Sequence, residues 1–289
     1  MPELPEVETV KRGLEPVLKV RKIHKVELRR KDLRFPFPKG FATRLEGAQI
    51  TALARRAKYI LANLDNGSSL LIHLGMTGRF TVLAADGASN LGQFYFETGA
   101  GEMADGPHDH VVFHLDHGVR VVYSDPRRFG MMDLLVTAEP EAHKLLKGLG
   151  VEPLGNEFSV AYLATTFKGK KAPLKAALLD QRIIAGLGNI YVCEALFRAR
   201  LSPKRRAGSV KPEKLEELVR HIRDILNDAI LAGGSTLQDF QGTNGEQGSY
   251  QQRFLVYDRE GEPCPNCGRP IKRIVQSGRS SFYCSFCQK

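Results

Sequence analysis

The sequence lacks the features of a membrane protein, a secreted protein or a repeat protein. It has no apolar run long enough to cross a membrane, no signal peptide before its helix-like N-terminus, and no internal repeat. Acidic residues are also fewer than basic residues. The chain has 32 Asp and Glu and 42 Lys and Arg, which gives a formal net charge of +10. This excess of positive charge suits a polyanionic partner. The alternative is a solvated basic surface that binds no such partner. We therefore expect a soluble, cytoplasmic protein.

Cysteine is scarce as well, with five in 289 residues, but four of the five form one motif. Cys264 and Cys267 make one Cys-x-x-Cys pair, and Cys284 and Cys287 make a second pair sixteen residues further on. This spacing is typical of a tetrahedral four-thiolate zinc site, in which no position stays open for catalysis. Two disulfides are the alternative, but they fit poorly with an intracellular chain. The fifth, Cys193, lies in a helical pattern and is expected to be a buried, small hydrophobic residue.

The first half of the chain is patterned mostly as strands. A first helix is expected over residues 5–17, and short strand-like runs follow between about residues 23 and 135. Many short strands separated by close turns argue for an antiparallel sandwich or barrel. Residues 84–109 are rich in Gly, Ala and Asp, so we expect a long loop there, with one weak strand at 93–96.

The second half is patterned as helices. Helices are expected at 172–181, 190–199 and 212–231, and Gly233 and Gly234 end the last of them. Residues 241–250 are polar and glycine-rich, which indicates a loop. Between the two cysteine pairs, the sequence predicts two strands that turn at 276–279, with Arg279 at the tip where it could reach a phosphate.

The N-terminus carries a candidate for covalent chemistry. If the initiator Met1 is removed, Pro2 becomes the N-terminal residue, and the carboxylates of Glu3 and Glu6 follow it. A secondary amine that attacks a sugar aldehyde forms an iminium ion, which is cationic without a proton and acts as an electron sink. An α-amine titrates near about 8 and a lysine near about 10.4, so the α-amine is the better nucleophile at neutral pH. The alternative is a frayed terminus whose proline merely starts a helix.

Further motifs run along the chain in a fixed order. They are Met1–Thr9, 55–59 (Arg-Arg-Ala-Lys-Tyr), 73–78 (His-Leu-Gly-Met-Thr-Gly), 125–130 (Asp-Pro-Arg-Arg-Phe-Gly), 186–191 (Gly-Leu-Gly-Asn-Ile-Tyr) and the terminal cysteine motif. With these motifs the chain resembles bacterial formamidopyrimidine-DNA glycosylases, the Fpg/MutM family, along nearly its whole length. Leu4 in the opening motif favours this branch over the related endonuclease VIII branch.

The resemblance implies a fold, a partner and an activity. The implied fold is α+β and multidomain, and its expected parts are a β-sandwich catalytic domain with an N-terminal helix (1–137), a linker (138–150), a helical domain with a helix–two-turn–helix (151–240), and a lesion loop with a four-Cys zinc finger (241–289). The implied protein is a monomeric, nucleoid-associated enzyme that binds double-stranded DNA and one structural Zn²⁺. The implied activity is that of a bifunctional DNA glycosylase/AP lyase that removes 8-oxoguanine and formamidopyrimidines. The alternatives are an endonuclease VIII-type enzyme for oxidised pyrimidines and a non-catalytic zinc-finger protein that binds damaged DNA.

The resemblance also assigns catalytic roles to individual residues. Pro2 is the Schiff-base nucleophile at C1′, and Glu3 protonates the deoxyribose ring oxygen. Lys58 contacts the phosphate near the lesion and assists proton transfer, and Arg279 is the zinc finger's phosphate contact. From the sequence alone, Lys58 is only a lysine that enters a strand.

DNA binding and lesion recognition are assigned in the same way. Met76, Arg127 and Phe129 fill the void left by the extruded nucleotide, and Arg127 favours a cytosine opposite the lesion. Contacts to the DNA backbone and to the lesion are implied for His73, Lys170, Asn189, Glu6 and Tyr250. The same residues also fit simpler structural roles: Asn189 could be an N-cap, and Glu6 could be a first-turn glutamate that interacts with the helix dipole.

A group of histidines invites a metal interpretation. It consists of His108, His110, His114 and His117. Strand alternation around a turn at His117 instead favours scattered surface and packing histidines.

Overall fold

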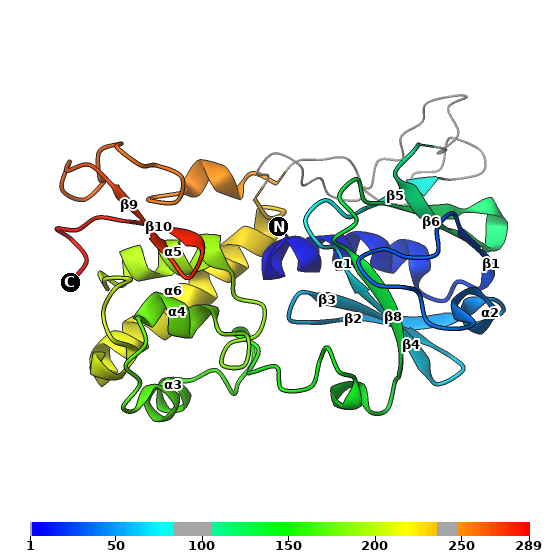
Figure 1. Ribbon diagram of the computed structural model, residues 1–289, viewed down its shortest axis with the longest axis horizontal. Coiled ribbons are helices and arrows are strands. Elements are labelled where there is room, and N and C mark those ends of the chain that lie inside the picture. Colours follow the sequence, from blue (N-terminus) through cyan, green and yellow to red (C-terminus); the bar gives the residue numbers. More distant parts are fainter. Residues whose placement is uncertain (1, 84–105, 236–247) are drawn as a thin grey trace. The chain divides into compact units, whose positions relative to one another are not determined.

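The computed structural model describes residues 2–83, 106–235 and 248–289, which form two compact units (Figure 1). The N-terminal unit consists of Met1–Lys147 with Gly233–Ser249, and the C-terminal unit of Gly148–Ala232 with Tyr250–Lys289. The domain boundaries expected from the sequence stay a prediction. The expected strand at 93–96 lies outside the described residues.

The two expected loops are only partly described. Most of the loop expected at 84–109 and of the loop expected at 241–250 lies outside the described residues. At the end of the first of them, Asp109 already belongs to a strand.

The N-terminal unit begins with helix α1 (Leu4–Leu18), in agreement with the helix expected at 5–17. Proline in the first turn suits a helix start, and a capping box between Glu3 and Glu6 satisfies backbone N–H groups there. The apolar face of α1 packs against the second of the two sheets described below.

Two four-stranded antiparallel sheets follow in the described part of this unit. The first has the order β1–β6–β7–β5, with β1 (Ile23–Leu28), β6 (Asp109–Leu115), β7 (Arg120–Ser124) and β5 (Arg79–Leu83). The second has the order β2–β3–β4–β8, with β2 (Ile50–Arg56), β3 (Tyr59–Leu64), β4 (Ser68–His73) and β8 (Met131–Val136). The short helix α2 (Phe41–Leu45) packs against β1.

The inner faces of the two sheets share one hydrophobic core. Phe80, Phe113 and Val121 of the first sheet and Ile60 and Ile72 of the second are each at most 5% exposed. The unit is therefore a β-sandwich, as the dense turn signals predicted. Its loops and strand ends, together with the start of α1, hold the candidate site residues of this unit.

The C-terminal unit is helical and ends in a hairpin. Its helices are α3 (Val160–Phe167), α4 (Leu174–Leu179), α5 (Asn189–Arg198) and α6 (Pro212–Leu231), and its strands are β9 (Lys272–Gln276) and β10 (Arg279–Tyr283). Single 3₁₀ turns lie at Asp116–Gly118 and Pro140–Ala142 in the N-terminal unit and at Ala207–Ser209 and Tyr250–Arg253 in the C-terminal unit. None of the described helices is long and apolar enough to cross a membrane.

Three helices were expected in this half of the chain. Helix α6 has the expected bounds, and α5 is shifted by one residue. Helix α4 is shorter than the expected 172–181, because Pro173 caps its start and Asp180 takes an extended conformation at its end. Helix α3 was not expected. Its start is capped by the Ser159 hydroxyl, which accepts the Tyr162 N–H at 3.2 Å.

Val20 is a strained position in the turn that follows α1. Its φ of +61° is left-handed, which costs a β-branched residue about 1 kcal/mol or more, and its side chain is 65% exposed. Its backbone N–H donates to the Ile50 carbonyl at 2.8 Å, so a substitution of the side chain leaves this hydrogen bond in place.

We expect Val20→Asn to raise the free energy of unfolding by about 1 kcal/mol, because asparagine tolerates the left-handed conformation. Urea unfolding monitored by circular dichroism measures the change. Val136→Asn is the matched control, because Val136 is similarly exposed, at 61%, but lies in the regular strand β8. An equal or larger gain in the control would show that the strain at Val20 is not the cause.

Candidate active site

The N-terminal residues are buried and held by hydrogen bonds. Pro2 is buried and Glu3 is 4% exposed at the N-cap of α1. The Glu3 backbone N–H donates to Glu6 Oε2 at 2.8 Å, and the Glu3 carboxylate accepts from the Glu6 backbone in return. The segment is therefore ordered, unlike the frayed terminus that was the alternative.

Glu6 also ties α1 to the segment that follows α6. Its Oε1 accepts the Ser235 N–H at 2.8 Å and the Ser235 hydroxyl at 3.0 Å. Gly234 has a φ of +83°, and a Cβ on it would come within 3.0 Å of Glu6 Cγ, so glycine suits both its backbone and the close approach. The structure thus places Glu6 at the junction of α1 and residues 233–235. A contact with a lesion stays a prediction.

Lys58 lies in the two-residue turn between β2 and β3 and is 8% exposed. Ala57 beside it has a φ of +53° and completes a tight hairpin. Arg55 Nε donates to Glu8 Oε2 at 2.9 Å, and Arg55 Nη1 donates to the Ala57 carbonyl at 3.0 Å. This chain of contacts joins the first turns of α1 to the hairpin turn that carries Lys58.

His73 ends β4 as a neutral ring. Burial, together with the nearby charges of Lys58 and Arg34, lowers the pKa of His73 from 6.5 to about 4. Its Nδ1 lies 3.0 Å from the Gly75 N–H and accepts that hydrogen bond, so the ring proton of the neutral form is on Nε2. His73 is thus suited to donate one hydrogen bond and is not a cation at neutral pH.

Two loops of the N-terminal unit carry the residues that are expected to fill the void left in the DNA by the extruded nucleotide. Met76 is half-buried on one loop, while Arg127 and Phe129 are exposed on the other. The Arg127 guanidinium carbon lies 4.9 Å from the centre of the Phe129 ring. A Cβ on Gly75 would collide with the backbone of Phe129 and the next residue, so the two loops are in direct contact.

The histidine group does not form a metal site. In the described part of the chain, the four clustered cysteines are the single group of three or more metal-binding side chains. His110 is 3% exposed and its Nε2 lies 2.9 Å from the Asp125 carbonyl, which makes it a packing residue. His108 and His117 are exposed.

In the C-terminal unit, Asn189 and Lys175 hold the zinc-finger hairpin. Asn189 Nδ2 donates to the Ser280 carbonyl at 3.0 Å. Lys175 is 1% exposed, and its Nζ donates to the Ser280 carbonyl and to Ser281 Oγ, both at 2.7 Å. Lys175 was not among the expected site residues, because a buried lysine with partners about a hundred residues away leaves no local pattern.

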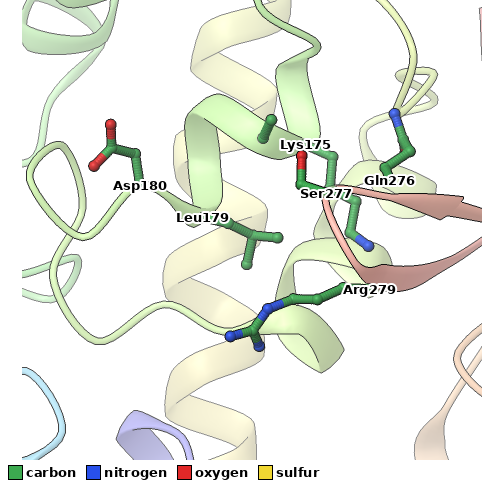
Figure 2. A pocket seen from close by; sticks show the side chains of 7 residues that line it. Lys175, Leu179, Asp180, Gln276, Ser277 and Arg279 are labelled. Atoms are coloured by element: carbon green, nitrogen blue, oxygen red, sulfur yellow. The ribbon is translucent and has the colours of Figure 1, made fainter.

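A cavity of about 290 Å³ lies beside this hairpin (Figure 2). Lys175, Leu179 and Asp180 line it from α4 and its end, and Gln276, Ser277 and Arg279 line it from the hairpin. Figure 2 shows the Arg279 side chain extending from the hairpin past Leu179. Arg279 begins β10, one residue past Gly278, so it does lie at the tip as expected.

Lys170 and Tyr250 occupy different environments. Lys170 is half-buried after α3. The hydrogen bond from Arg182 lowers the pKa of Asp180, and the charges of Arg182 and Lys170 lower it further. Tyr250 is fully buried in the core of the C-terminal unit, with its ring 5.8 Å from the ring of Tyr191. Burial raises the pKa of Tyr250 to about 12. A lesion contact by Tyr250 stays a prediction.

The four cysteines of the motif converge as predicted. Their Sγ atoms all lie within 4.8 Å of one another, with 3.9 Å between Cys264 and Cys287 and 3.6 Å between Cys267 and Cys284. Four sulfur atoms around Zn²⁺ at about 2.3 Å form a tetrahedron with edges of about 3.8 Å. The donor set therefore fits one structural zinc. Cys193 is 2% exposed in the same hydrophobic cluster, as a buried small residue.

Glu194 anchors the segment that leads into the zinc finger. It is fully buried, and its carboxylate accepts the backbone N–H groups of Leu255, Val256 and Tyr257 at 2.8–3.0 Å. Burial raises the pKa of Glu194, and the three backbone donors oppose that shift. Glu194 was not among the expected site residues either, since a glutamate within a helix usually faces solvent.

Cys284→Ser should lower the bound zinc well below one ion per chain, because three thiolates and a hydroxyl hold Zn²⁺ weakly. Loss of the metal should also unfold the hairpin, since a structural zinc contributes about 10 kcal/mol or more to such a fold. Atomic emission on the purified protein measures the metal, and Cys193→Ala, which changes the fifth cysteine, should retain one ion. One tightly held zinc in Cys284→Ser would contradict the four-thiolate site.

The neutral His73 predicts a pH dependence of stability. Because its folded pKa of about 4 lies below the ordinary 6.5, the unfolded chain binds more protons between these two pH values. The contribution of the neutral ring is complete above pH 6.5 and is lost as the pH falls toward 4. As the pH falls from 6.5 toward 4, the free energy of unfolding of wild type should decrease by up to about 3 kcal/mol more than that of His73→Gln.

Urea unfolding at stepped pH values measures this difference. His24→Gln, which changes an exposed histidine on β1, should follow the wild-type curve. If His73→Gln follows it as well, the depressed pKa of His73 is wrong.

Comparisons with known proteins agree along the whole chain. Three family models match: the Formamidopyrimidine-DNA glycosylase N-terminal domain at residues 1–132, the Formamidopyrimidine-DNA glycosylase H2TH domain at 149–241, and the zinc finger found in FPG and IleRS at 261–289. A formamidopyrimidine-DNA glycosylase of Ruegeria sp. is 55% identical over 291 residues, with 100% of both chains covered. One of Rhodopseudomonas palustris is 54% identical over 295 residues, again with 100% of both chains covered.

Solved structures show the same fold. The MutM (Fpg) protein of Thermus thermophilus aligns with a TM-score of 0.84 at 39% identity, covering 99% of this chain and 98% of that one. The Lactococcus lactis Fpg (MutM) in complex with DNA containing N7-benzyl-Fapy-dG aligns with a TM-score of 0.86 at 30% identity, covering 100% of both chains. The expected fold class and family are thereby confirmed, and the chain belongs to the formamidopyrimidine-DNA glycosylase family.

Proposed function

We propose that this glycosylase of base excision repair uses the secondary amine of Pro2 as the nucleophile that removes oxidised purines and then cleaves the abasic strand. One observation carries the proposal: Pro2 and Glu3 are buried together at the start of α1 and are held there by the capping box with Glu6. An amine at the positive end of a helix is disfavoured as an ammonium ion, which increases the fraction that is free to attack.

The reaction begins with base excision. The Pro2 nitrogen attacks C1′ of the damaged nucleotide, the bond from C1′ to the base breaks, and the base leaves with its electron pair and takes up a proton. Glu3 protonates the deoxyribose ring oxygen, the ring opens, and the nitrogen and C1′ form an iminium ion. The burial of Glu3 keeps its carboxyl group out of bulk water, which suits an acid that delivers its proton to one atom.

Strand cleavage follows from the same iminium ion. Loss of a proton from C2′ feeds electrons into the iminium, and the 3′ phosphate leaves; a second elimination releases the 5′ phosphate. Water then hydrolyses the iminium and frees the Pro2 amine. The buried Lys58 ammonium is suited to neutralise the phosphate beside the lesion and to assist proton transfer.

The base must leave the duplex before Pro2 can reach C1′. The exposed Phe129 ring is a wedge for the base step, and the half-buried Met76 is an adaptable apolar filler. The exposed Arg127 can donate to both acceptors of an orphaned cytosine, whereas an orphaned adenine presents a donor there. These properties support a preference for lesions opposite cytosine.

The contacts to the DNA backbone come from both units. His73 offers one neutral donor, and Arg279 and Lys170 offer cations. Asn189 opens α5, where the positive end of the helix dipole favours a phosphate. Its side chain also holds the hairpin of Arg279 through Ser280, which couples these two phosphate contacts.

The substrate range is tested with more than one lesion. One Lactococcus lactis Fpg structure is a complex with DNA that contains an oxidised pyrimidine. The test therefore compares duplexes with 8-oxoguanine, a formamidopyrimidine or an oxidised pyrimidine, each opposite cytosine. Faster excision of the purine lesions supports the proposal, and faster excision of the pyrimidine would favour the endonuclease VIII-type alternative.

Borohydride trapping tests the nucleophile. Wild type lacking Met1 should form a covalent adduct with 8-oxoguanine DNA, because borohydride reduces the iminium to a stable amine. Pro2→Gly should trap at least about tenfold more slowly, since it replaces the secondary amine by a primary amine and loosens the start of α1. Peptide mapping of the adduct locates the modified nitrogen.

Pro38→Gly is the matched control, because it removes a proline from the segment between β1 and α2 and should trap at the wild-type rate. An adduct that forms unchanged in Pro2→Gly, or that maps to a lysine, would contradict the role of Pro2. A folded wild type that forms no adduct would favour the non-catalytic alternative.

A further inference from the structure

A buried carboxylate joins the two loops that carry Met76, Arg127 and Phe129. Asp125 is fully buried, and its Oδ2 accepts the Gly130 N–H at 2.8 Å, at the end of the loop that holds Arg127 and Phe129. Its Oδ1 accepts the hydroxyl of Thr77, which directly follows Met76, at 2.6 Å. One side chain therefore fixes both loops.

The Thr77 hydroxyl makes a second contact across the loops. It accepts the backbone N–H of Arg127 at 3.2 Å while it donates its own proton to Asp125. The hydroxyl is thus a bridge between a buried carboxylate and the backbone of an exposed arginine. Neither contact survives replacement of the hydroxyl by a methyl group, although the shape of the side chain would be kept.

The surrounding packing leaves the two loops little freedom to shift. A Cβ on Gly130 would collide with the Tyr123 hydroxyl, and a Cβ on Gly78 would collide with the same hydroxyl and with the Leu74 carbonyl. The Tyr123 hydroxyl itself donates to Asp125 Oδ2 at 3.3 Å. Burial, together with the Asp125 charge, raises the pKa of Tyr123, so this hydroxyl keeps its proton and remains a donor.

We propose that Thr77 is a positioning residue for opposite-base selection: its hydroxyl holds the backbone at Arg127 in register with the Met76 loop. This inference rests on the proposed contact between Arg127 and the orphaned base. The guanidinium lies over the Phe129 ring at 4.9 Å, so its direction depends on how the backbone of this loop is held.

A small displacement of Arg127 affects the two opposite bases unequally. Two hydrogen bonds to a cytosine edge need the guanidinium plane in one place, because both donors must meet their acceptors together. The adenine edge presents one donor and makes no such paired contact, so it loses little when the plane shifts. Loss of the Thr77 bridge should therefore lower the preference for cytosine over adenine more than it lowers the overall rate.

The test compares single-turnover excision of 8-oxoguanine opposite cytosine and opposite adenine by Thr77→Val. Rates are normalised to the active fraction, which is measured by borohydride trapping on an abasic duplex. The ratio of the two rates should fall about tenfold, as expected for the loss of hydrogen bonds that place a charged group. Thr77→Ser, which keeps the hydroxyl, should restore the wild-type ratio.

Further variants separate positioning from general damage. Thr51→Val removes a hydroxyl that donates to the Asn63 carbonyl within the second sheet, and it should leave the ratio unchanged. In an Arg127→Ala background, Thr77→Val should lower the ratio no further, because the group that it positions is gone. If excision by Thr77→Val is too slow to measure, the dissociation constants for a tetrahydrofuran abasic duplex opposite each base give the same ratio.

The outcomes are distinguishable. A wild-type ratio in Thr77→Val, or an equal loss opposite both bases, overturns the positioning role. Absence of a cytosine preference in wild type, or its persistence in Arg127→Ala, instead overturns the proposed contact of Arg127 with the orphaned base. A low ratio in Thr77→Ser would show that the methyl group of Thr77, and not its hydroxyl, holds the loop.

Discussion

The exchange of hydrogen bonds between Glu3 and Glu6 is the interaction on which the site depends. It caps α1, and it also places Pro2, the residue before the cap, in a defined and buried position. A residue at a chain terminus would otherwise sample many conformations, and in the proposed reaction the entropy of ordering Pro2 would add to the barrier. Because Glu6 holds Ser235 with its other oxygen, the same carboxylate fixes residues that lie more than two hundred positions away.

Buried carboxylates that accept backbone N–H groups occur at several segments of the chain. Glu6 accepts the backbone of Ser235, Asp125 accepts the backbone of Gly130, and Glu194 accepts three N–H groups before the zinc finger. Each carboxylate is at most 2% exposed. A buried carboxylate is costly unless donors surround it, and backbone N–H groups are donors that no substitution except proline removes. The scarce acids of this basic chain thus include several that hold loops in place.

The sequence predicted the regular parts of the fold well. Helix α6 and the hairpin of β9 and β10 were expected with nearly their observed bounds, because an apolar stripe and a pair of turn residues are local signals. The four cysteines were found by their spacing alone. The order of strands in the two sheets was not predicted, since pairing depends on contacts distant in sequence. The assignment of Gly233–Ser249 to the N-terminal unit was not foreseen for the same reason.

In the candidate site, too, residues within local motifs were expected, whereas residues that depend on partners distant in sequence were not. Most of the residues that would meet DNA stand in motifs that carry the family resemblance, Lys170 and Tyr250 being the exceptions, and their individual roles stay predictions. The residues that hold them were missed: Asp125 and Thr77 behind Arg127, and Lys175 behind Arg279. Each lies within or beside a recognised segment, but its partner comes from another part of the chain. Periodicity, capping signals and turn residues describe neighbours in sequence, so they carry no information about such pairs.

This division has a physical consequence for how the enzyme tolerates change. An exposed side chain such as Phe129, at 43% exposure, can be replaced without disturbing the core, so its loss should affect DNA contacts more than stability. The fully buried Asp125 holds several donors at once, and its removal would leave the Gly130 N–H and the Thr77 hydroxyl without an acceptor. If the exposed residues contact DNA as proposed, substitutions there can change lesion choice at little cost in stability, whereas substitution of a buried carboxylate leaves buried donors without an acceptor. The exposed residues of these loops can be exchanged because the buried hydrogen bonds of Asp125 keep the backbone of both loops in place.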